Sequence, residues 1–133
     1  MPMIILTCLA SRLSNKQVVW VEDRMEHLTA ASSATGRLTK IKASIDDQGT
    51  IHALDYDQID DVGAYPRAPE PASLYRMHGN LSGAYKVKNI RCRNRVILTN
   101  KTPSGLNRGF GGPQHYFALE RLVHQIAVEL KLN

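Results

Sequence analysis

A glycine-rich segment in the last third of the sequence is the part best suited to hold an anion or a polar cofactor. It runs from Gly105 to Gln114 and has glycines at 105, 109, 111 and 112. Glycines let the backbone approach another group closely, and a helix start behind the segment leaves amide donors unpaired. Such a loop suits a phosphate, an oxo group or a polarised cofactor. A flexible loop that only reverses the chain is the alternative.

Two side chains within this segment are candidates for contact with a bound group. Arg108 supplies a fixed positive charge with planar donor geometry. Phe110 lies between glycines, so it is free to form the wall of a pocket. Pro113 suits the first position of the following helix, because the amide it lacks is not needed there.

The sequence lacks the common metal-binding, catalytic and nucleotide-binding motifs. The five histidines and two cysteines show no paired metal-ligand spacing. No G-x-S-x-G, Walker A or G-x-G-x-x-G motif occurs. The aspartate pairs 46–47 and 60–61 are expected at turns, where solvation explains them without acid–base chemistry. The sequence therefore predicts no metal ligands and no catalytic side chain.

The elements that must position the glycine-rich segment indicate an α+β fold. Helices are expected over Ile4–Leu13 and after Pro113, with a helical turn within Asp23–Ala31. Alternation predicts a hairpin of two strands, from 38 to 45 and from 50, joined by an Asp-Asp-Gln-Gly turn. Further strands are expected over 18–21 and 89–99. We expect a mixed β-sheet with this hairpin, packed against an N-terminal and a C-terminal helix.

Length and composition fit a single domain spanning residues 1–133. The chain is 43% hydrophobic and 22% charged, which is typical of a globular protein. No stretch approaches the roughly 18 apolar residues of a transmembrane helix. The apolar start has no basic leader and no clear cleavage site. We therefore expect no membrane association and a cytoplasmic location.

The net charge of +5 is unevenly distributed along the chain. Seven of the twelve acidic residues lie between Asp46 and Glu70, whereas residues 71–119 hold eight basic residues and no acidic one. Within this block, Arg91, Arg93 and Arg95 share one strand face. Two interpretations remain open: a basic strand beside an acidic one in the same sheet, or a binding surface for an anionic partner such as nucleic acid. No aromatic residue is interleaved with the arginines, which argues against a nucleic-acid platform.

Three stretches in the second half have distinctive sequences. They are Tyr85–Ile90, Leu98–Pro103 and the R-G-F-G-G-P-Q run that starts at Arg108, followed by Leu119–Leu122. These stretches resemble the molybdenum-binding large subunit of the xanthine oxidase family. Val18–Arg24 and Asp61–Tyr65 are similar to further elements of that family. The family includes aldehyde oxidases and aerobic carbon monoxide dehydrogenase-like proteins.

The resemblance implies an oxidoreductase that hydroxylates a C–H bond next to nitrogen or oxygen, in aldehydes or N-heterocycles. It implies a molybdenum–pterin cofactor, with iron–sulfur clusters and FAD on partner chains. Arg108 and Gly109 would then face the cofactor, while Phe110 and Arg76 would contact the substrate. The partners would be the remaining portions of the molybdenum subunit and the iron–sulfur and flavin subunits.

The sequence also departs from that family. Residues 106–114 contain no cysteine, so the copper-binding residue of carbon monoxide-oxidising members is missing. The family's first glycine-rich stretch, its pterin-binding glutamine region and its catalytic glutamate have no counterpart in residues 1–133. We therefore expect a middle fragment of a larger subunit that is inactive alone. A non-catalytic binding module using the basic strand face, or an inactive orphan fragment, are the alternatives.

Overall fold

The computed structural model describes residues 2–34, 36–67, 79–106, 108–109 and 111–132. The chain divides into two compact units, residues 1–31 and 32–133. None of the helices in the described ranges is long and apolar enough to span a bilayer. That residues 1–133 form one domain stays a prediction.

The first unit contains two helices, α1 (Pro2–Ser14) and α2 (Arg24–Ala30). Asp23 caps α2: its carboxylate accepts from the Glu26 amide at 2.8 Å, and the Glu26 carboxylate accepts from the Asp23 amide at 3.0 Å. This reciprocal capping explains why the helix begins there. The expected strand over 18–21 is wrong, because these residues form a loop in which Val19 and Val21 are exposed.

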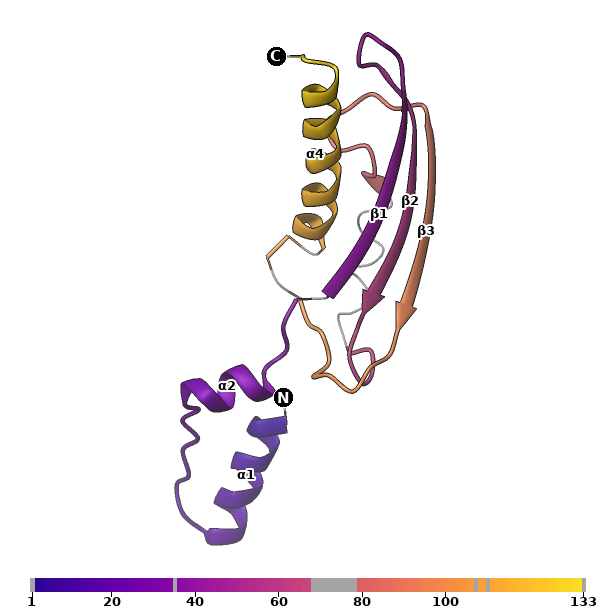
Figure 1. Ribbon diagram of the computed structural model, residues 1–133. Coiled ribbons are helices and arrows are strands. Elements are labelled where there is room, and N and C mark those ends of the chain that lie inside the picture. Colours follow the sequence, from indigo (N-terminus) through magenta and orange to yellow (C-terminus); the bar gives the residue numbers. More distant parts are fainter. Residues whose placement is uncertain (1, 35, 68–78, 107, 110, 133) are drawn as a thin grey trace. The chain divides into compact units, whose positions relative to one another are not determined.

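The second unit is built on a three-stranded sheet in the order β1-β2-β3 (Figure 1). Its strands are β1 (Gly36–Ile45), β2 (Ile51–Asp61) and β3 (Asn89–Ile97). β1 and β2 are antiparallel, whereas β2 and β3 are parallel, so the sheet is mixed. The α+β prediction is therefore confirmed, and the predicted hairpin is β1–β2.

The hairpin turn contains the hydrogen bonds and the backbone conformation that its residue types predict. Asp46 Oδ1 accepts hydrogen bonds from the amides of Gln48, at 3.0 Å, and Thr50, at 2.8 Å. Gly49 has a φ of 81°, a conformation that side chains disfavour. The local sequence thus fixes where β1 ends and β2 begins.

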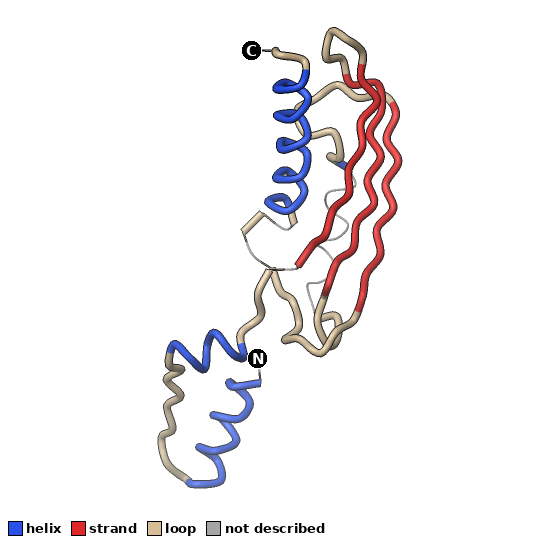
Figure 2. Tube along the Cα trace, in the orientation of Figure 1, coloured by secondary structure: helices blue, strands red, loops and turns tan. Residues whose placement is uncertain are grey.

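Helix α4 (Gly112–Glu129) covers one face of the sheet (Figures 1 and 2). The buried core consists of Leu54 and Tyr56 from β2 and Leu119 from α4. Ile41, Cys92 and Leu122 are among the partly buried side chains packed around it. The predicted C-terminal helix is therefore confirmed. Helix α1 belongs to the other unit, so its packing against the sheet stays a prediction.

The expectation that Asp60 and Asp61 lie at a turn is wrong. Both belong to β2, whose buried positions alternate through residues 54, 56, 58 and 60. Asp60 therefore points to the helix-covered face, where it is fully buried. The apolar alternation of Leu54 and Tyr56 is followed by polar residues at 58 and 60, so residue type alone did not mark Asp60 as buried.

Candidate cofactor-binding site

The loops that follow the parallel strands β2 and β3 are fastened together by backbone hydrogen bonds. The Val62 amide donates to Ile97 O at 3.1 Å, and the Thr99 amide donates to Gly63 O at 3.0 Å. The Ser104 amide returns to Val62 O, also at 3.0 Å. Parallel strands end at the same edge of a sheet, which is a common place for ligand sites. The glycine-rich segment therefore leaves from a fixed edge.

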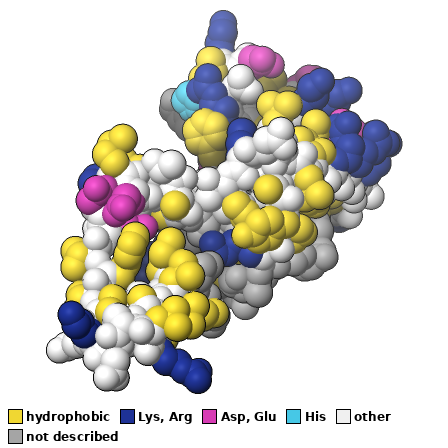
Figure 3. All heavy atoms as spheres, turned by 90° about the horizontal axis from the view of Figure 1, so that it is seen from below, with side chains coloured by type: hydrophobic (Ala, Val, Ile, Leu, Met, Phe, Trp, Pro, Cys, Tyr) yellow, Lys and Arg dark blue, Asp and Glu magenta, His cyan; other side chains and the backbone are white. Residues whose placement is uncertain are grey.

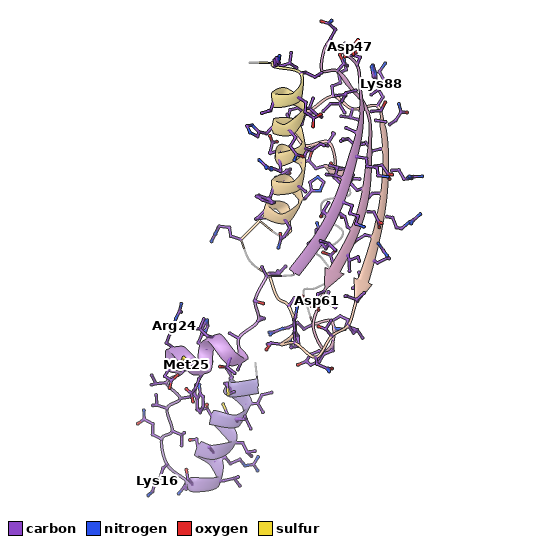
Figure 4. The ribbon with its side chains drawn as sticks, viewed as in Figure 1. Lys16, Arg24, Met25, Asp47, Asp61 and Lys88 are labelled. Carbon is purple, nitrogen blue, oxygen red and sulfur yellow. The ribbon has the colours of Figure 1, made fainter. Side chains whose placement is uncertain are left out.

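Asp61, at the end of β2, organises this edge (Figure 4). Its carboxylate accepts from Thr99 Oγ1 at 2.6 Å, from Lys101 Nζ at 2.7 Å and from the Gly63 amide at 3.0 Å. The bond from Lys101, followed by those from Thr99 and Gly63, lowers the pKa of Asp61 from 3.8 to about 2. Asp61 is thus ionised at neutral pH and ties both loops to the sheet.

Gly63 permits the close approach of the two loops. It has a φ of 76°, and an added Cβ atom would lie 2.5 Å from Thr102 O and 2.8 Å from Pro103 Cα. No side chain fits there without moving the backbone. Gly63 and the Thr99–Pro103 stretch therefore pack directly against each other, although they are far apart in the sequence.

The glycine-rich segment leads from this edge into α4. The Gly105 amide donates to Ser33 O at 2.8 Å, and an added Cβ at Gly105 would lie 2.5 Å from Ser32 Oγ. Gly109 and Gly111 have φ values of 97° and 82°. Gly111 is the N-cap of α4 and offers no side chain to the first amides, and a proline follows at the first helical turn, as predicted.

The structure describes two of the four predicted site residues. Arg108 and Gly109 form a turn, and both are exposed. Phe110 and Arg76 lie outside the described residues. The roles of Arg108, Gly109, Phe110 and Arg76 therefore stay predictions.

The residues around the segment fit an anionic cofactor. The N-terminus of α4 has no side-chain cap and carries the positive end of the helix dipole. Ser104 Oγ is buried and has no hydrogen-bond partner among the described residues. A phosphate-bearing group suits such a helix terminus, with Arg108 as a candidate charge-assisted donor. Within the described ranges, no group of three or more His, Cys, Asp or Glu residues is arranged to hold a metal ion.

A buried polar layer, which the sequence did not predict, lies between β1, β2 and β3. Arg37 Nε donates to Asp60 Oδ1 at 2.6 Å, and Arg37 Nη2 donates to Asp60 Oδ2 at 2.9 Å. Asn94 Nδ2 donates to Asp60 Oδ2 at 2.8 Å. Bidentate pairing satisfies the buried carboxylate and aligns the three strands near the edge where the loops begin.

A second unpredicted feature fastens the first turns of α4 to residues 79–85. Tyr56 Oη donates to Leu81 O at 2.7 Å, and His115 Nε2 lies 3.1 Å from the same oxygen. A carbonyl oxygen only accepts, so His115 Nε2 carries the proton. Burial raises the pKa of Tyr56 to about 12, which keeps its phenol a donor. Through Leu81 O, His115 thus connects the start of α4 to residues 79–85 and to Tyr56 in β2.

The comparisons with known proteins bear on this glycine-rich segment directly. The model of the family described as "Molybdopterin cofactor-binding domain" matches residues 1–133. The chain belongs to this family. Its match covers the full chain, including the glycine-rich segment and α4.

Relatives of known name and structure agree with this assignment. The gamma subunit of the 6-hydroxypseudooxynicotine dehydrogenase complex from Paenarthrobacter nicotinovorans is 30% identical over 132 residues, which are 99% of this chain. The crystal structure of quinoline 2-oxidoreductase from Pseudomonas putida 86 matches with a TM-score of 0.88 at 33% identity over 99% of the chain. Reconstituted CO dehydrogenase from Oligotropha carboxidovorans shares the fold over 97% of the chain, with a TM-score of 0.82 at 24% identity.

This molybdopterin cofactor-binding domain chain is much shorter than these proteins. It covers 17% of the length of the gamma subunit, 17% of the quinoline 2-oxidoreductase chain and 16% of the CO dehydrogenase chain. The chain thus matches about one sixth of a much longer subunit.

Proposed function

We propose that this chain forms part of a multi-chain molybdenum hydroxylase, in which it contributes the cofactor-side and substrate-pocket loop. The match of the molybdopterin cofactor-binding domain model over residues 1–133 carries this proposal. The uncapped α4 terminus and the positive-φ glycines supply the anion-binding geometry that such a loop needs. Aldehydes or N-heterocycles are the proposed substrates, because relatives are named as aldehyde oxidases and a quinoline oxidoreductase.

Each of the four predicted site residues has a stated task in this proposal. Arg108 and the Gly109 backbone face the anionic part of the cofactor, while Phe110 and Arg76 contact and orient the substrate. When bound, the molybdenum–pterin group supplies the oxygen-transfer and redox chemistry of hydroxylation. Iron–sulfur and flavin groups on partner chains would accept the electrons. We propose a cytoplasmic location for the assembled enzyme.

The chain alone is proposed to be inactive. None of the residues assigned to the site is a general base, so proton removal needs a group supplied from elsewhere. A partial set of cofactor contacts also binds weakly, because association carries an entropic cost that a few contacts do not offset. The remaining portions of the molybdenum subunit must therefore complete the site.

Replacement of Arg108 in the assembled enzyme tests the cofactor-side role. Arg108→Ala is expected to lower turnover by about 10²-fold, the usual order for losing one preorganised charged donor. It should also lower the molybdenum content. Arg121→Ala is the matched control, since Arg121 is an exposed arginine on α4, and it should leave both quantities unchanged. Equal turnover in wild type and Arg108→Ala would contradict the assignment.

A further inference from the structure

The sheet face opposite α4 is a charged surface that the proposed cofactor site does not use. Charged side chains on this face include Lys40 and Lys42 on β1, Asp55 and Asp57 on β2, and Arg91, Arg93 and Arg95 on β3. Figure 3 shows Lys and Arg side chains gathered at the right of the view, the side on which β3 lies in Figure 1. The prediction that a basic strand lies beside an acidic one is therefore confirmed.

Ion pairs within the sheet occupy both aspartates. Arg91 binds Asp55 with an Nη2–Oδ2 distance of 2.6 Å, and Arg95 binds Asp57 with an Nη2–Oδ1 distance of 2.7 Å. Lys40, Lys42 and Arg93 form no ion pair with any residue that the structure describes, and all three are exposed. The face therefore keeps an excess of positive charge after its internal pairing.

Two hollows lie among these charged side chains. A hollow of about 320 Å³ is bounded by Lys40, Lys42 and Arg93, together with Asp55, Asp57 and Arg91. A second hollow of about 620 Å³ shares Lys42, Asp55 and Arg91 with the first and adds Lys88. Figure 4 places Lys88 at the opposite end of the sheet from Asp61. The two hollows, which share three lining residues, are together called the outer groove, defined by the seven charged residues Lys40, Lys42, Asp55, Asp57, Lys88, Arg91 and Arg93.

The register of the sheet gives the groove a regular charge spacing. Lys40, Asp57 and Arg93 are aligned across the three strands, and Lys42, Asp55 and Arg91 form the next such row. Along one strand, these rows are two residues apart, or roughly 6.6 Å. Acidic side chains at alternate positions of an extended peptide have the same spacing.

We propose that the outer groove binds an extended, acidic segment of a polypeptide. Charge complementarity supports this occupant, because three exposed cations form no ion pair with the described residues and the groove keeps a positive excess. Nucleic acid fits less well. The ring of Tyr56, the only aromatic residue lining either hollow, is buried on the other face. This inference does not depend on the proposed cofactor role.

Binding of a labelled Glu-Thr-Glu-Thr-Glu-Thr-Glu peptide to the full chain, measured by fluorescence anisotropy, tests the proposal. We expect binding that weakens as salt rises. The triple variant Lys40→Ala/Lys42→Ala/Arg93→Ala should bind roughly tenfold more weakly, since each exposed ion pair contributes little alone. All three residues are exposed, so the variant should fold normally.

A matched variant removes the same charge elsewhere. Lys16→Ala/Arg24→Ala/Arg121→Ala should bind the peptide as the wild type does, because these exposed residues do not line the groove. Equal weakening in both variants would overturn the proposal, and so would the absence of binding at low salt. Tighter binding of a single-stranded oligonucleotide of equal charge would show a nucleic-acid surface instead.

Discussion

Arg37 and Asp60 form a bidentate ion pair inside the protein, with Nε and Oδ1 2.6 Å apart and side chains 3% and 0% exposed. The pair joins β1 to β2 beneath α4, near the edge from which the glycine-rich segment starts. A buried pair of this kind is costly to break because one charge is then left without compensation.

Arg37→Met is therefore expected to lower the free energy of unfolding by about 3–5 kcal/mol, as measured by chemical denaturation. The double variant Arg37→Met/Asp60→Asn, which removes both charges, should recover part of this loss. Arg91→Ala breaks an exposed pair and should change the free energy little. An Arg37→Met variant as stable as wild type would show that the pair does not align the strands.

Asp61 should make the stability of the fold depend on acid. Its pKa is about 2 in the folded protein and 3.8 ordinarily, so the folded state favours the ionised form. The contribution is complete above about pH 4 and is lost as the pH falls toward 2. The melting temperature of Asp61→Asn should thus fall less between pH 4 and 2 than that of wild type. Asp47→Asn, in an exposed turn, should keep the wild-type slope; identical slopes in all three proteins would exclude this role.

Gly63→Ala should destabilise the edge where the two loops meet. Its φ of 76° costs a side chain about 1–2 kcal/mol, and the added methyl would also press on Thr102 and Pro103. Gly79→Ala is the control, because an added Cβ there meets nothing within 4 Å. Thermal unfolding should separate the two variants by several degrees. Equal melting temperatures would mean that the loops are not in close contact.

His115 should be observed with its proton on Nε2. Leu81 O accepts from both Tyr56 and His115, so the imidazole must donate from that nitrogen. Nitrogen NMR of histidine-labelled protein distinguishes the two tautomers directly. Tyr56→Phe should cost about 0.5–1.5 kcal/mol of stability through the lost hydrogen bond. A proton on Nδ1 alone would contradict the described contact.

Local patterns predicted the elements better than their long-range partners. Alternation through Thr39, Ile41 and Ala43 and the turn at Asp46 defined the hairpin, because both signals lie within a few residues. The parallel pairing of β2 with β3 has no such local signal. The same holds for the Arg37–Asp60 pair and for the shared bonds to Leu81. Val18–Val21 has strand-forming residue types but, in the described ranges, no neighbouring strand to pair with.

At the candidate site, too, residue types predicted the local features but not the long-range contacts. The glycines, the proline at the start of α4 and the open helix terminus follow from residue type, and the structure contains them. The anchoring of the segment by Asp61 and Gly63 was not predicted, because those residues come from another strand end. The roles of Arg108 and Gly109 depend on groups outside this chain, so they remain predictions.

Metal content and turnover, measured on the purified chain alone and on the chain assembled with the remaining portions of the subunit, test the central claim most directly. Stoichiometric molybdenum and hydroxylation of aldehydes or N-heterocycles are expected only in the assembled sample. Stoichiometric molybdenum together with turnover in the isolated chain would contradict it.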